Sequence, residues 1–396
     1  MNLVRVVIHA VLIFGAVTVQ AAERTLNVDT RHVKVYHESG RFAGWPANHG
    51  IWSWGDEILV GFGRGYHKDL GSSHNIDRQR TEDHLLARSL DGGESWMIED
   101  PSENGHLIPG PVHLFGSVRE GLVTPEPVAC PGGIDFTHPD FAMTVRMFSR
   151  QAGQSWFSHS YDRGKSWSGP FRLPLMGTEG IEARTNYSIA GKHECTLFLN
   201  TTGGAKADGK PAARRSFCAR TIDGGKTWNF VSEIGPPLEG NAIMPSAVPL
   251  SEDGLLCVLR RRVRGKQPQA WLAAFASNDD GRTWSRLPHP VQDTGVGNPA
   301  SLIRLQDGRV CVTYGVRKPP YRMCAKLSDD GGQSWSEEIV LRADGGNGDL
   351  GYARSIQRPD GKVVTIYYFW DKQSGPERYI AATIWDPAAP PRRSTR

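Results

Sequence analysis

The sequence predicts an all-β protein folded as a single β-propeller of four-stranded blades. Three observations support this prediction: one turn motif recurs five times, the segments between the copies read as short strands, and turn-forming and aromatic residues are abundant. The 396 residues include 45 Gly, 26 Pro and 12 Trp, a composition typical of all-β chains. The length would also suit two or three domains, but a radial fold can hold this many strands in one closed domain.

The recurring motif is Ser/Thr-x-Asp-x-Gly-x-Ser/Thr-Trp. Its five copies begin at Ser89, Ser160, Thr221, Ser277 and Ser328. Asp and Gly favour a tight hairpin turn, and the hydroxyl can bond the turn's main chain. The Trp then opens the next strand and packs within the sheet. Five copies, each with its Trp, indicate a structural repeat.

Each copy separates the third and fourth strands of one expected blade. In the fifth unit the expected strands are 299–304, 309–314, 322–327 and 335–341. In the first unit, strands 50–54, 57–62 and 83–89 precede the motif. These units predict five blades with the same strand order.

A sixth unit lacks the motif but offers strands 352–357, 362–369 and 378–385. Segment 32–38 is expected to supply its outer strand, because a blade shared by both termini closes the ring and removes a free sheet edge. The prediction is therefore six blades, or seven if segment 102–130 forms a degenerate one.

The N-terminus has the features of a signal peptide. Arg5 supplies positive charge, residues 6–17 are mostly apolar, and Val19-Gln20-Ala21 suits cleavage. We expect a leader over residues 1–21, a propeller domain over 22–396, and a secreted or periplasmic protein. The apolar run is too short to span a bilayer, as is every later one, so no transmembrane segment is expected. A retained anchor is the alternative.

Charge and cysteine content narrow the possible partners. A formal net charge of +4 is too small to indicate nucleic acid. In an exported protein, Cys195 and Cys218, or Cys311 and Cys324, could form disulfides across adjacent strands; buried free thiols are the alternative. No Cys-x-x-Cys pair occurs, so a structural zinc site is not indicated. No metal site or cofactor is expected, although metal dependence stays open because no ligand spacing demands or excludes a loop calcium.

The expected innermost strands begin with polar segments. These segments start at Asn48, Asp135, Arg184, Asn241, Gly297 and Gly351. Further polar residues lie just behind them: Arg64, His67, Arg262, Arg317 and Arg322. A radial fold would bring all of them around one channel mouth, which predicts a site for an anionic oligo- or polysaccharide. The alternative is a water-filled channel with solvated walls.

The five motifs resemble the Asp-box, or BNR repeat, of the sialidase superfamily. Segment 298–328 is similar to the sialidase segment carrying one arginine of the carboxylate-binding triad. Gly351-Tyr352 followed by Pro359-Asp360-Gly361 is similar to the segment carrying the nucleophilic tyrosine. The resemblance implies Arg322 as a clamp residue and Tyr352 as a nucleophile. Segments 40–46 and 199–202 depart from the family's pattern for the other two arginines, and the family's acid would be Asp77 or Asp83.

A second resemblance concerns the first blade. Trp45-Pro-Ala-Asn-His49-Gly-Ile-Trp-Ser-Trp-Gly55 resembles the opening of propellers that act on uronic-acid glycans, among them α-L-rhamnosidases and ulvan lyases. This resemblance implies a catalytic role for His49. Those families have seven blades, against the six counted here.

Together these features predict an enzyme that cleaves a glycosidic bond in a uronate- or sialate-containing glycan. An imidazole can move protons near neutral pH, and arginine binds carboxylates bidentately. The candidate catalytic residues are His49, Tyr352, Tyr187 and Glu182. The candidate substrate-binding residues are Arg184, Arg322, Arg354, Asn298, His67 and Asn48. Hydrolase and lyase chemistry both remain open, as do an exo-α-sialidase using Tyr352, a non-catalytic glycan-binding propeller and, less favoured, a propeller of the photosystem-assembly type.

Overall fold

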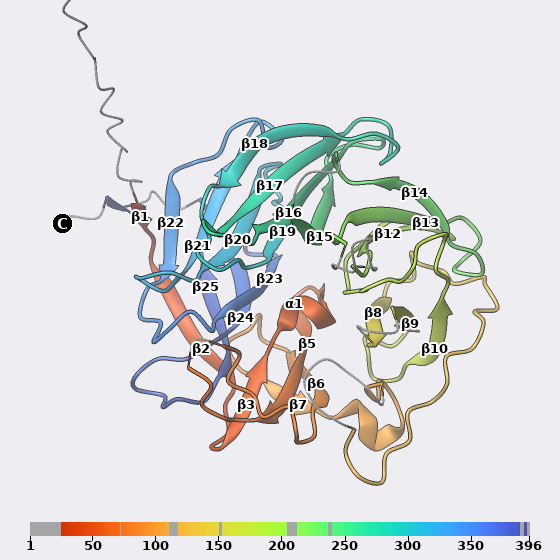
Figure 1. Cartoon of the computed structure of the whole chain (residues 1–396), viewed down its shortest axis with the longest axis horizontal. Helices are drawn as coiled ribbons and strands as arrows, with labels where there is room; N and C mark the ends of the chain where they lie inside the picture. Colours follow the sequence, from red (N-terminus) through yellow and green to blue (C-terminus); the bar gives the residue numbers. More distant parts are fainter. Residues whose placement is uncertain are drawn as a thin grey trace, which may run out of the picture.

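The computed structural model describes residues 25–71, 73–110, 118–149, 153–203, 212–236, 240–388 and 392–393. The expected leader, residues 1–21, lies outside the described residues. Six sheets surround a central channel, as Figure 1 shows. The all-β propeller prediction and the count of six blades are confirmed. No helix of the described residues is long and apolar enough to cross a membrane.

The first three blades are built from residues 41–233. Blade I contains β3 (Arg41–Gly44), β4 (Ile51–Trp54), β5 (Glu57–Tyr66), β6 (Asp83–Ser89) and β7 (Met97–Glu99). Blade II contains β8 (Ala142–Ser149), β9 (Gln154–Ser160) and β10 (Ser168–Leu173). Blade III contains β11 (Tyr187–Gly191), β12 (Glu194–Asn200), β13 (Ser216–Thr221) and β14 (Asn229–Glu233).

The last three blades complete the ring. Blade IV contains β15 (Asn241–Pro249), β16 (Leu255–Val263), β17 (Gln269–Ser277) and β18 (Ser285–Val291). Blade V contains β19 (Ala300–Arg304), β20 (Val310–Val316), β21 (Arg322–Ser328) and β22 (Glu338–Arg342). Blade VI contains β23 (Gly351–Gln357), β24 (Val363–Phe369), β25 (Tyr379–Trp385) and β2 (Thr30–Tyr36).

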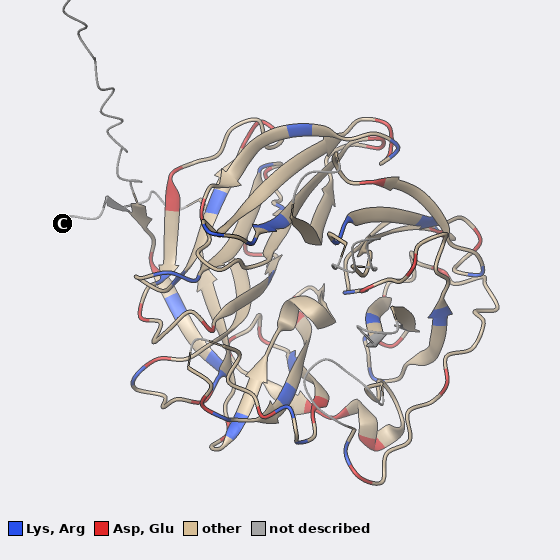
Figure 2. Cartoon of the chain, viewed as in Figure 1, with Lys and Arg blue, Asp and Glu red and all other residues tan. Residues whose placement is uncertain are grey.

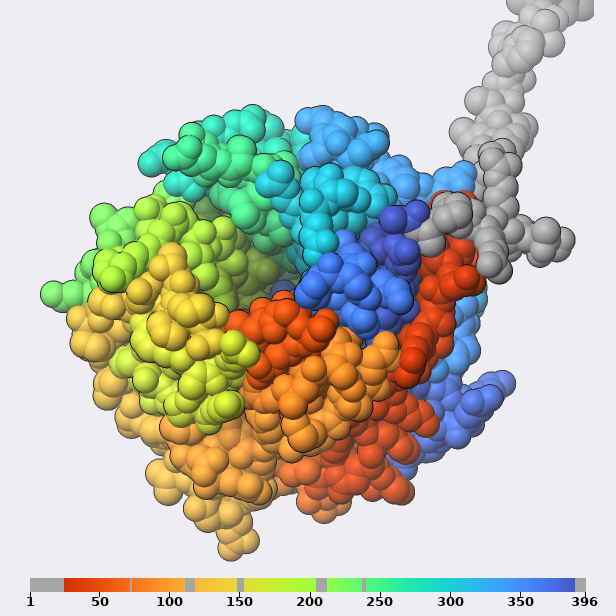
Figure 3. All heavy atoms as spheres, turned by 180° about the vertical axis from the view of Figure 1, so that it is seen from behind, coloured from red at the N-terminus to blue at the C-terminus, as the bar shows by residue number. Residues whose placement is uncertain are grey.

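The ring closes as expected, because β2 from the N-terminal segment pairs antiparallel with β25 from the C-terminal blade. Figure 3, seen from behind, shows the first and last blades (red-orange and blue) side by side. Two short strands, β1 (Thr25–Asn27) and β26 (Arg392–Arg393), extend the outer edge of blade V beyond β22. The pairing of distant chain segments removes an open edge in blade VI.

The Asp-box turns are self-contained hydrogen-bonded units. In the first box, Gly93 N–H donates to Ser89 Oγ (2.8 Å) and Ser95 N–H donates to Asp91 Oδ1 (2.9 Å). Burial opposes ionisation of Asp91, but the hydrogen bonds from Ser95, Ser89 and Glu94 together outweigh it and lower the pKa of Asp91 to about 2. The other four boxes repeat the bonds from their Gly and their second Ser or Thr.

The boxes and the channel mouth lie at opposite ends of the ring. Neighbouring strands within a blade are antiparallel, so an inner strand starts at the end opposite the turn between the third and fourth strands. We call the two ends of the channel the mouth and the box end. The mouth is where the inner strands begin.

Blade II departs from the predicted pattern, because among the residues that the structure describes it has three strands and no innermost one. Ile134 N–H donates to Gly224 O in the third box (3.1 Å), and Phe136 N–H donates to Lys192 O (2.8 Å). The expectation that the segment starting at Asp135 borders the mouth is therefore wrong, since this segment enters blade II from the box end. Segment 102–130 contributes part of the 3₁₀ helix η1 (Pro101–Asn104) and irregular chain in its described part, so a seventh blade is excluded there.

A short helix, α1 (Pro46–His49), interrupts the inner strand of blade I and lies in the channel in Figure 1. The strand can break here because Trp45 adopts a left-handed conformation with φ 62°, and Pro46 suits the first helical turn. The helix therefore turns the chain toward the centre of the ring.

All six cysteines are free and buried. On paired strands Cys195 faces Thr221 and Cys218 faces Phe198, and Cys311 faces Leu327 while Cys324 faces Tyr314. Neither expected pair is therefore in register for a disulfide, and the alternative of buried thiols is confirmed.

Candidate functional site

Tyr352 is presented by a bulge at the start of the innermost strand of blade VI. The pairing register shifts between Gly351 and Arg354, and Tyr352 adopts a left-handed φ of 54°. Asn298 holds this conformation, since its Oδ1 accepts from Tyr352 N–H (3.0 Å) and its Nδ2 donates to Leu350 O (2.9 Å). A Cβ at position 351 would lie 2.0 Å from Asn298 Nδ2, which requires glycine there. Such strained bulges often re-aim side chains at functional sites.

The same device recurs in blade IV at Met244. Its φ is 56°, and the register shifts between Ile243 and Ser246. Met244 N–H donates to Asn200 Oδ1 (2.9 Å). Arg260 on β16 then joins the two bulges across the channel: its Nη1 lies 4.0 Å from Met244 Sδ and 3.4 Å from the Tyr352 hydroxyl.

Two buried arginines surround the Tyr352 side chain. The Arg317 guanidinium lies 5.3 Å from the centre of the Tyr352 ring and donates to Leu350 O and to the Tyr368 hydroxyl. Burial alone would raise the pKa of Tyr352, but the charges of Arg260, Arg317 and Arg184 outweigh it and hold this pKa below 10. These cations therefore favour the phenolate form of Tyr352.

A histidine–aspartate pair lies beside the tyrosine. His74 Nδ1 is 2.7 Å from Asp349 Oδ1, and the His74 and Tyr352 ring centroids are 6.2 Å apart. Asp349 also accepts from the Tyr368 hydroxyl (2.8 Å) and from Arg378 Nε (3.0 Å). These contacts join the loop after β5 to the loop before β23.

The pair has defined protonation states. Burial would raise the pKa of Asp349, but the hydrogen bond from His74 and the charges of Arg378 and Arg317 hold it far below its usual range. Burial lowers the pKa of His74, against the opposing effect of Asp349. Because an ionised carboxylate can only accept, neutral His74 carries its proton on Nδ1, and Nε2 is the basic nitrogen.

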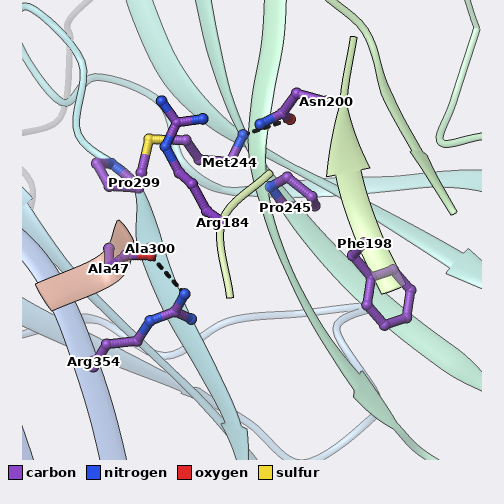
Figure 4. Close-up of a pocket in the computed structure, with 9 residues that line it drawn as sticks. All are labelled: Ala47, Arg184, Phe198, Asn200, Met244, Pro245, Pro299, Ala300 and Arg354. Carbon is purple, nitrogen blue, oxygen red and sulfur yellow. Dashed lines mark hydrogen bonds between the residues drawn. The ribbon is translucent and has the colours of Figure 1, made fainter. Parts of the chain in front are cut away.

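Deeper in the channel, a narrow pocket is lined by residues of four blades and α1. Figure 4 shows nine of them: Ala47, Arg184, Phe198, Asn200, Met244, Pro245, Pro299, Ala300 and Arg354. Arg184 Nε donates to Asn48 Oδ1 (2.9 Å), and its Nη1 is 3.6 Å from Glu182 Oε2. Arg354 donates to the carbonyls of Ala47 and Thr185.

The carboxylate of Glu182 pairs with two neighbouring arginines. It is 1% exposed, and Arg214 Nη1 donates to both of its oxygens (3.1 and 3.0 Å). Together with Arg184 it forms part of an ion-pair cluster. This arrangement favours a role in positioning Arg184 over the predicted role as a base.

His49 and Tyr187 both contact residues of blade I. His49 is 4% exposed, and its ring lies 4.8 Å from that of His84 between blades I and II. Burial, then Arg146 and Arg354, hold its pKa well below 6.5. The Tyr187 hydroxyl accepts from Trp52 Nε1 (3.1 Å), and burial raises its pKa. The catalytic roles assigned to both residues stay predictions.

Arg322 lies outside the group around Tyr352. Arg322 is on β21, the third strand from the channel, and its Nε donates to Glu338 Oε1 (2.8 Å). The residue of blade V that faces Tyr352 is Arg317, five positions earlier in the chain. His67 is half-buried at the start of the loop after β5, where its backbone N–H donates to Gly40 O (3.0 Å).

Sequence reasoning missed Arg260, His74 and Asp349. The run Arg260-Arg261-Arg262 at a strand end was a usable signal. Asp349 carried no signal in the sequence, because its contact with His74 joins residues 275 positions apart.

The candidate site has more cations than acids. Arg260 and Arg354 are 8% and 7% exposed, and in the described part of the chain no carboxylate pairs with either. Burial lowers the pKa of Arg354 to about 10, the expected response of a buried, uncompensated cation. Figure 2 shows Lys and Arg segments bordering the channel around β16. Among the described residues no group of three His, Cys, Asp or Glu could hold a metal ion.

Comparison with known proteins agrees with the architecture. A family model described as a BNR repeat-like domain matches residues 140–365. The chain belongs to this family. No curated protein sequence matches this BNR repeat-like propeller.

Several solved structures share the fold of this BNR repeat-like propeller. A protein of unknown function from Dyadobacter fermentans has a TM-score of 0.64 at 20% identity, covering 90% of this chain and 99% of that one. The NanB sialidase of Streptococcus pneumoniae has a TM-score of 0.57 at 11% identity, covering 89% and 70%. The α-L-arabinanase of Penicillium chrysogenum has a TM-score of 0.54 at 11% identity, covering 90% and 97%. At these identities the likeness concerns the fold.

Proposed function

We propose that this BNR repeat-like propeller hydrolyses a glycosidic bond next to an acidic sugar bound at the mouth. The observation that carries the proposal is the convergence of Arg260 and Arg317 on the Tyr352 side chain. A bulge that costs backbone strain holds this tyrosine between two buried cations.

The excess positive charge supports an anionic substrate. A buried guanidinium without a counter-ion is costly, and a bound carboxylate would offset that cost. Arginine donates two parallel hydrogen bonds to a carboxylate, which also fixes the orientation of the sugar. In this proposal Arg260 is the main clamp residue. Arg317 has the further task of stabilising negative charge on Tyr352, since its own donors already bond Leu350 and Tyr368.

The chemistry assigned to the site uses Tyr352 and His74. His74 Nε2 takes the phenolic proton while the Tyr352 oxygen attacks the anomeric carbon and the glycosidic bond breaks. The leaving oxygen then receives that proton from His74. A water molecule next gives a proton to His74 and attacks the same carbon, and the Tyr352 oxygen leaves and recovers its proton. Asp349 keeps His74 in the required tautomer throughout.

Two of the structurally similar proteins are named as a sialidase and an arabinanase, which supports a glycosidase on this fold. The assignment differs from the sequence-based prediction in using His74 for proton transfer instead of His49. It also replaces Arg322 by Arg260 and Arg317. Secretion stays a prediction from residues 1–21.

The test is a panel of fluorogenic α- and β-uronides, sialosides and arabinosides, assayed with wild type and Tyr352→Phe. The proposal expects turnover of at least one acidic glycoside, no turnover of the neutral arabinoside, and loss of turnover in the variant. If the wild type binds acidic sugars in calorimetry and never cleaves them, the protein is a glycan-binding module. Retention of full activity by Tyr352→Phe would contradict the assigned nucleophile.

A further inference from the structure

A second basic position lies beyond Arg260 toward the rim of the mouth. Arg260 and Arg262 are two residues apart on β16, so their side chains leave the same face of the sheet. Arg262 is opposite Asn241, the first residue of the inner strand β15. The two arginines therefore follow one line from the buried Tyr352 outward.

Blade III reaches the same place. Asn241 Oδ1 accepts from Arg214 N–H (3.0 Å), and Ala242 N–H donates to Arg214 O (2.9 Å). Arg214 thereby lies alongside the inner strand that pairs with Arg262. The two cations border one stretch of the mouth, shared by blades III and IV.

The charges around Arg262 are not balanced. Arg262 is half-buried, and burial together with the positive charges of Arg264, Arg317 and Arg214 lowers its pKa, against an opposing effect of Tyr352. Arg214 has a carboxylate partner in Glu182. For Arg262, by contrast, no carboxylate lies within ion-pair distance in the part of the chain that the structure describes. A half-buried cation held among like charges costs free energy that an anion would recover.

We propose that Arg262 binds a second acidic group of the substrate, next to the one held by Arg260. The inference rests on the proposed function and specifies its substrate class: an oligosaccharide with acidic groups on successive sugars. Two residues of a strand span about 6.6 Å, a distance comparable to one sugar ring with its linkage. Arg260 and Arg262 would thus bind the acidic groups of consecutive sugars where the oligosaccharide extends out of the mouth.

The alternative is that Arg262 is a solvated rim residue with no ligand. The two cases predict different effects of removing the Arg262 charge on the affinities of short and long ligands. A subsite residue contributes only when the ligand is long enough to reach it. If Arg262 acts only through the overall electrostatic potential, removing its charge would weaken the binding of every anion by a similar small factor.

The experiment is calorimetry on full-length wild type, Arg262→Gln and Arg304→Gln. Arg304 is exposed at the end of β19, at the box end, so its variant matches the loss of charge away from the mouth. The probes are galacturonate against trigalacturonate, and sialic acid against its α2,8-linked trimer. In wild type we expect one trimer to bind at least tenfold more tightly than its monomer.

In Arg262→Gln that trimer should lose about tenfold in affinity, the equivalent of one charge-assisted contact, while its monomer is unchanged. Arg304→Gln should alter neither, and Arg262→Lys should recover part of the trimer affinity. Equal weakening of monomer and trimer in Arg262→Gln, or no change in either, would overturn the inference while leaving the proposed function intact. If wild type binds none of the four probes, the proposed function fails, and this inference fails with it.

Discussion

The two ends of the channel use polar residues in opposite ways. At the box end, five turns of nearly identical sequence satisfy their polar groups within eight-residue units, as Ser89, Asp91 and Gly93 do in the first. At the mouth the polar residues come from different blades, and Arg260 and Arg354 are buried without acidic partners in the described residues. Repeated, locally satisfied polarity is structural, whereas unrepeated polarity with uncompensated charge indicates a ligand.

Left-handed backbone conformations occur at both ends of the ring. The inner strands of blades I, IV and VI each have a left-handed non-glycine residue near or at the mouth: Trp45, Met244 and Tyr352. Each such residue costs roughly 1 kcal/mol or more. The left-handed glycines of the boxes, such as Gly93, meet the same geometry without that cost. Two boxes also contain a left-handed non-glycine residue, Arg163 (φ 60°) and Asp280 (φ 57°), so strain occurs at both ends and does not by itself mark the functional one.

The largest expected effect is that of Tyr352→Phe, which removes only the hydroxyl beside Arg260. Turnover of the acidic glycoside identified by the panel should fall on the order of 10⁴-fold, because the covalent step is lost. Single-turnover assays and thermal melts check the result. A variant with unchanged melting and more than a tenth of wild-type kcat would contradict the contrast drawn between the two ends.

His74→Gln should reduce kcat by about 10²-fold or more, the usual contribution of a positioned acid–base group. His74 acts as a base only when unprotonated, and its pKa is held below 6.5. Wild-type activity should therefore be level near pH 7 and fall as the pH drops through this lowered pKa.

His74→Gln should lose the acid limb, that is, the fall in activity at low pH. In Asp349→Asn the hydrogen bond that raises the His74 pKa is weakened, so the limb should move to lower pH. An acid limb that is identical in wild type and His74→Gln would exclude His74 as the base.

Arg260→Gln and Arg322→Gln each remove one arginine charge, the first in the mouth and the second outside it. Removing the clamp should raise KM for an acidic substrate by about 30- to 100-fold, consistent with loss of a charge-assisted bidentate contact. Arg322→Gln breaks the ion pair with Glu338 and the hydrogen bond to Pro320 O, both away from Tyr352, and should change KM less than threefold. If Arg322→Gln had the larger effect on KM, the clamp expected from the sialidase resemblance would be restored.

The smallest effect belongs to the box end. Asp223→Ala removes the acceptor for Thr227 N–H (2.9 Å) and for the Thr227 hydroxyl (2.6 Å). Because this turn is exposed, the free energy of unfolding should fall by only about 1 kcal/mol, with kcat/KM unchanged. Asp330→Ala should behave alike, since its box has the same bonds. Denaturant unfolding of both variants measures this, and a change in kcat/KM would show that the two ends are coupled.

The fold was predictable because its signal is local. Each box specifies one turn within eight residues, and the strands around it follow from alternation, so β19 to β21 lie within two residues of their expected ends. Blade II was mispredicted because its missing inner strand leaves no mark in the sequence: segment 130–137 reads as polar whether it borders the mouth or the third box.

The candidate site was predictable only where a position is fixed by the start of an inner strand, as for Tyr352 and Asn298. Selection between Arg317 and Arg322 depends on which strand each occupies and on where β20 ends. Arg317, just after β20, lies at the channel, whereas Arg322, five positions later, lies on the third strand from it. The His74–Asp349 contact arises from two loops brought together by ring closure, which no local pattern encodes.

The central claim is that the mouth recognises a carboxylate. The most direct measurement is calorimetric binding of an acidic oligosaccharide and of its carboxyl-reduced, neutral counterpart to Tyr352→Phe, with and without Arg260→Gln. The account predicts that the acidic ligand binds at least tenfold more tightly than the neutral one, and that Arg260→Gln removes this difference. Equal affinity for the two ligands, or a preference unaffected by Arg260→Gln, would contradict it.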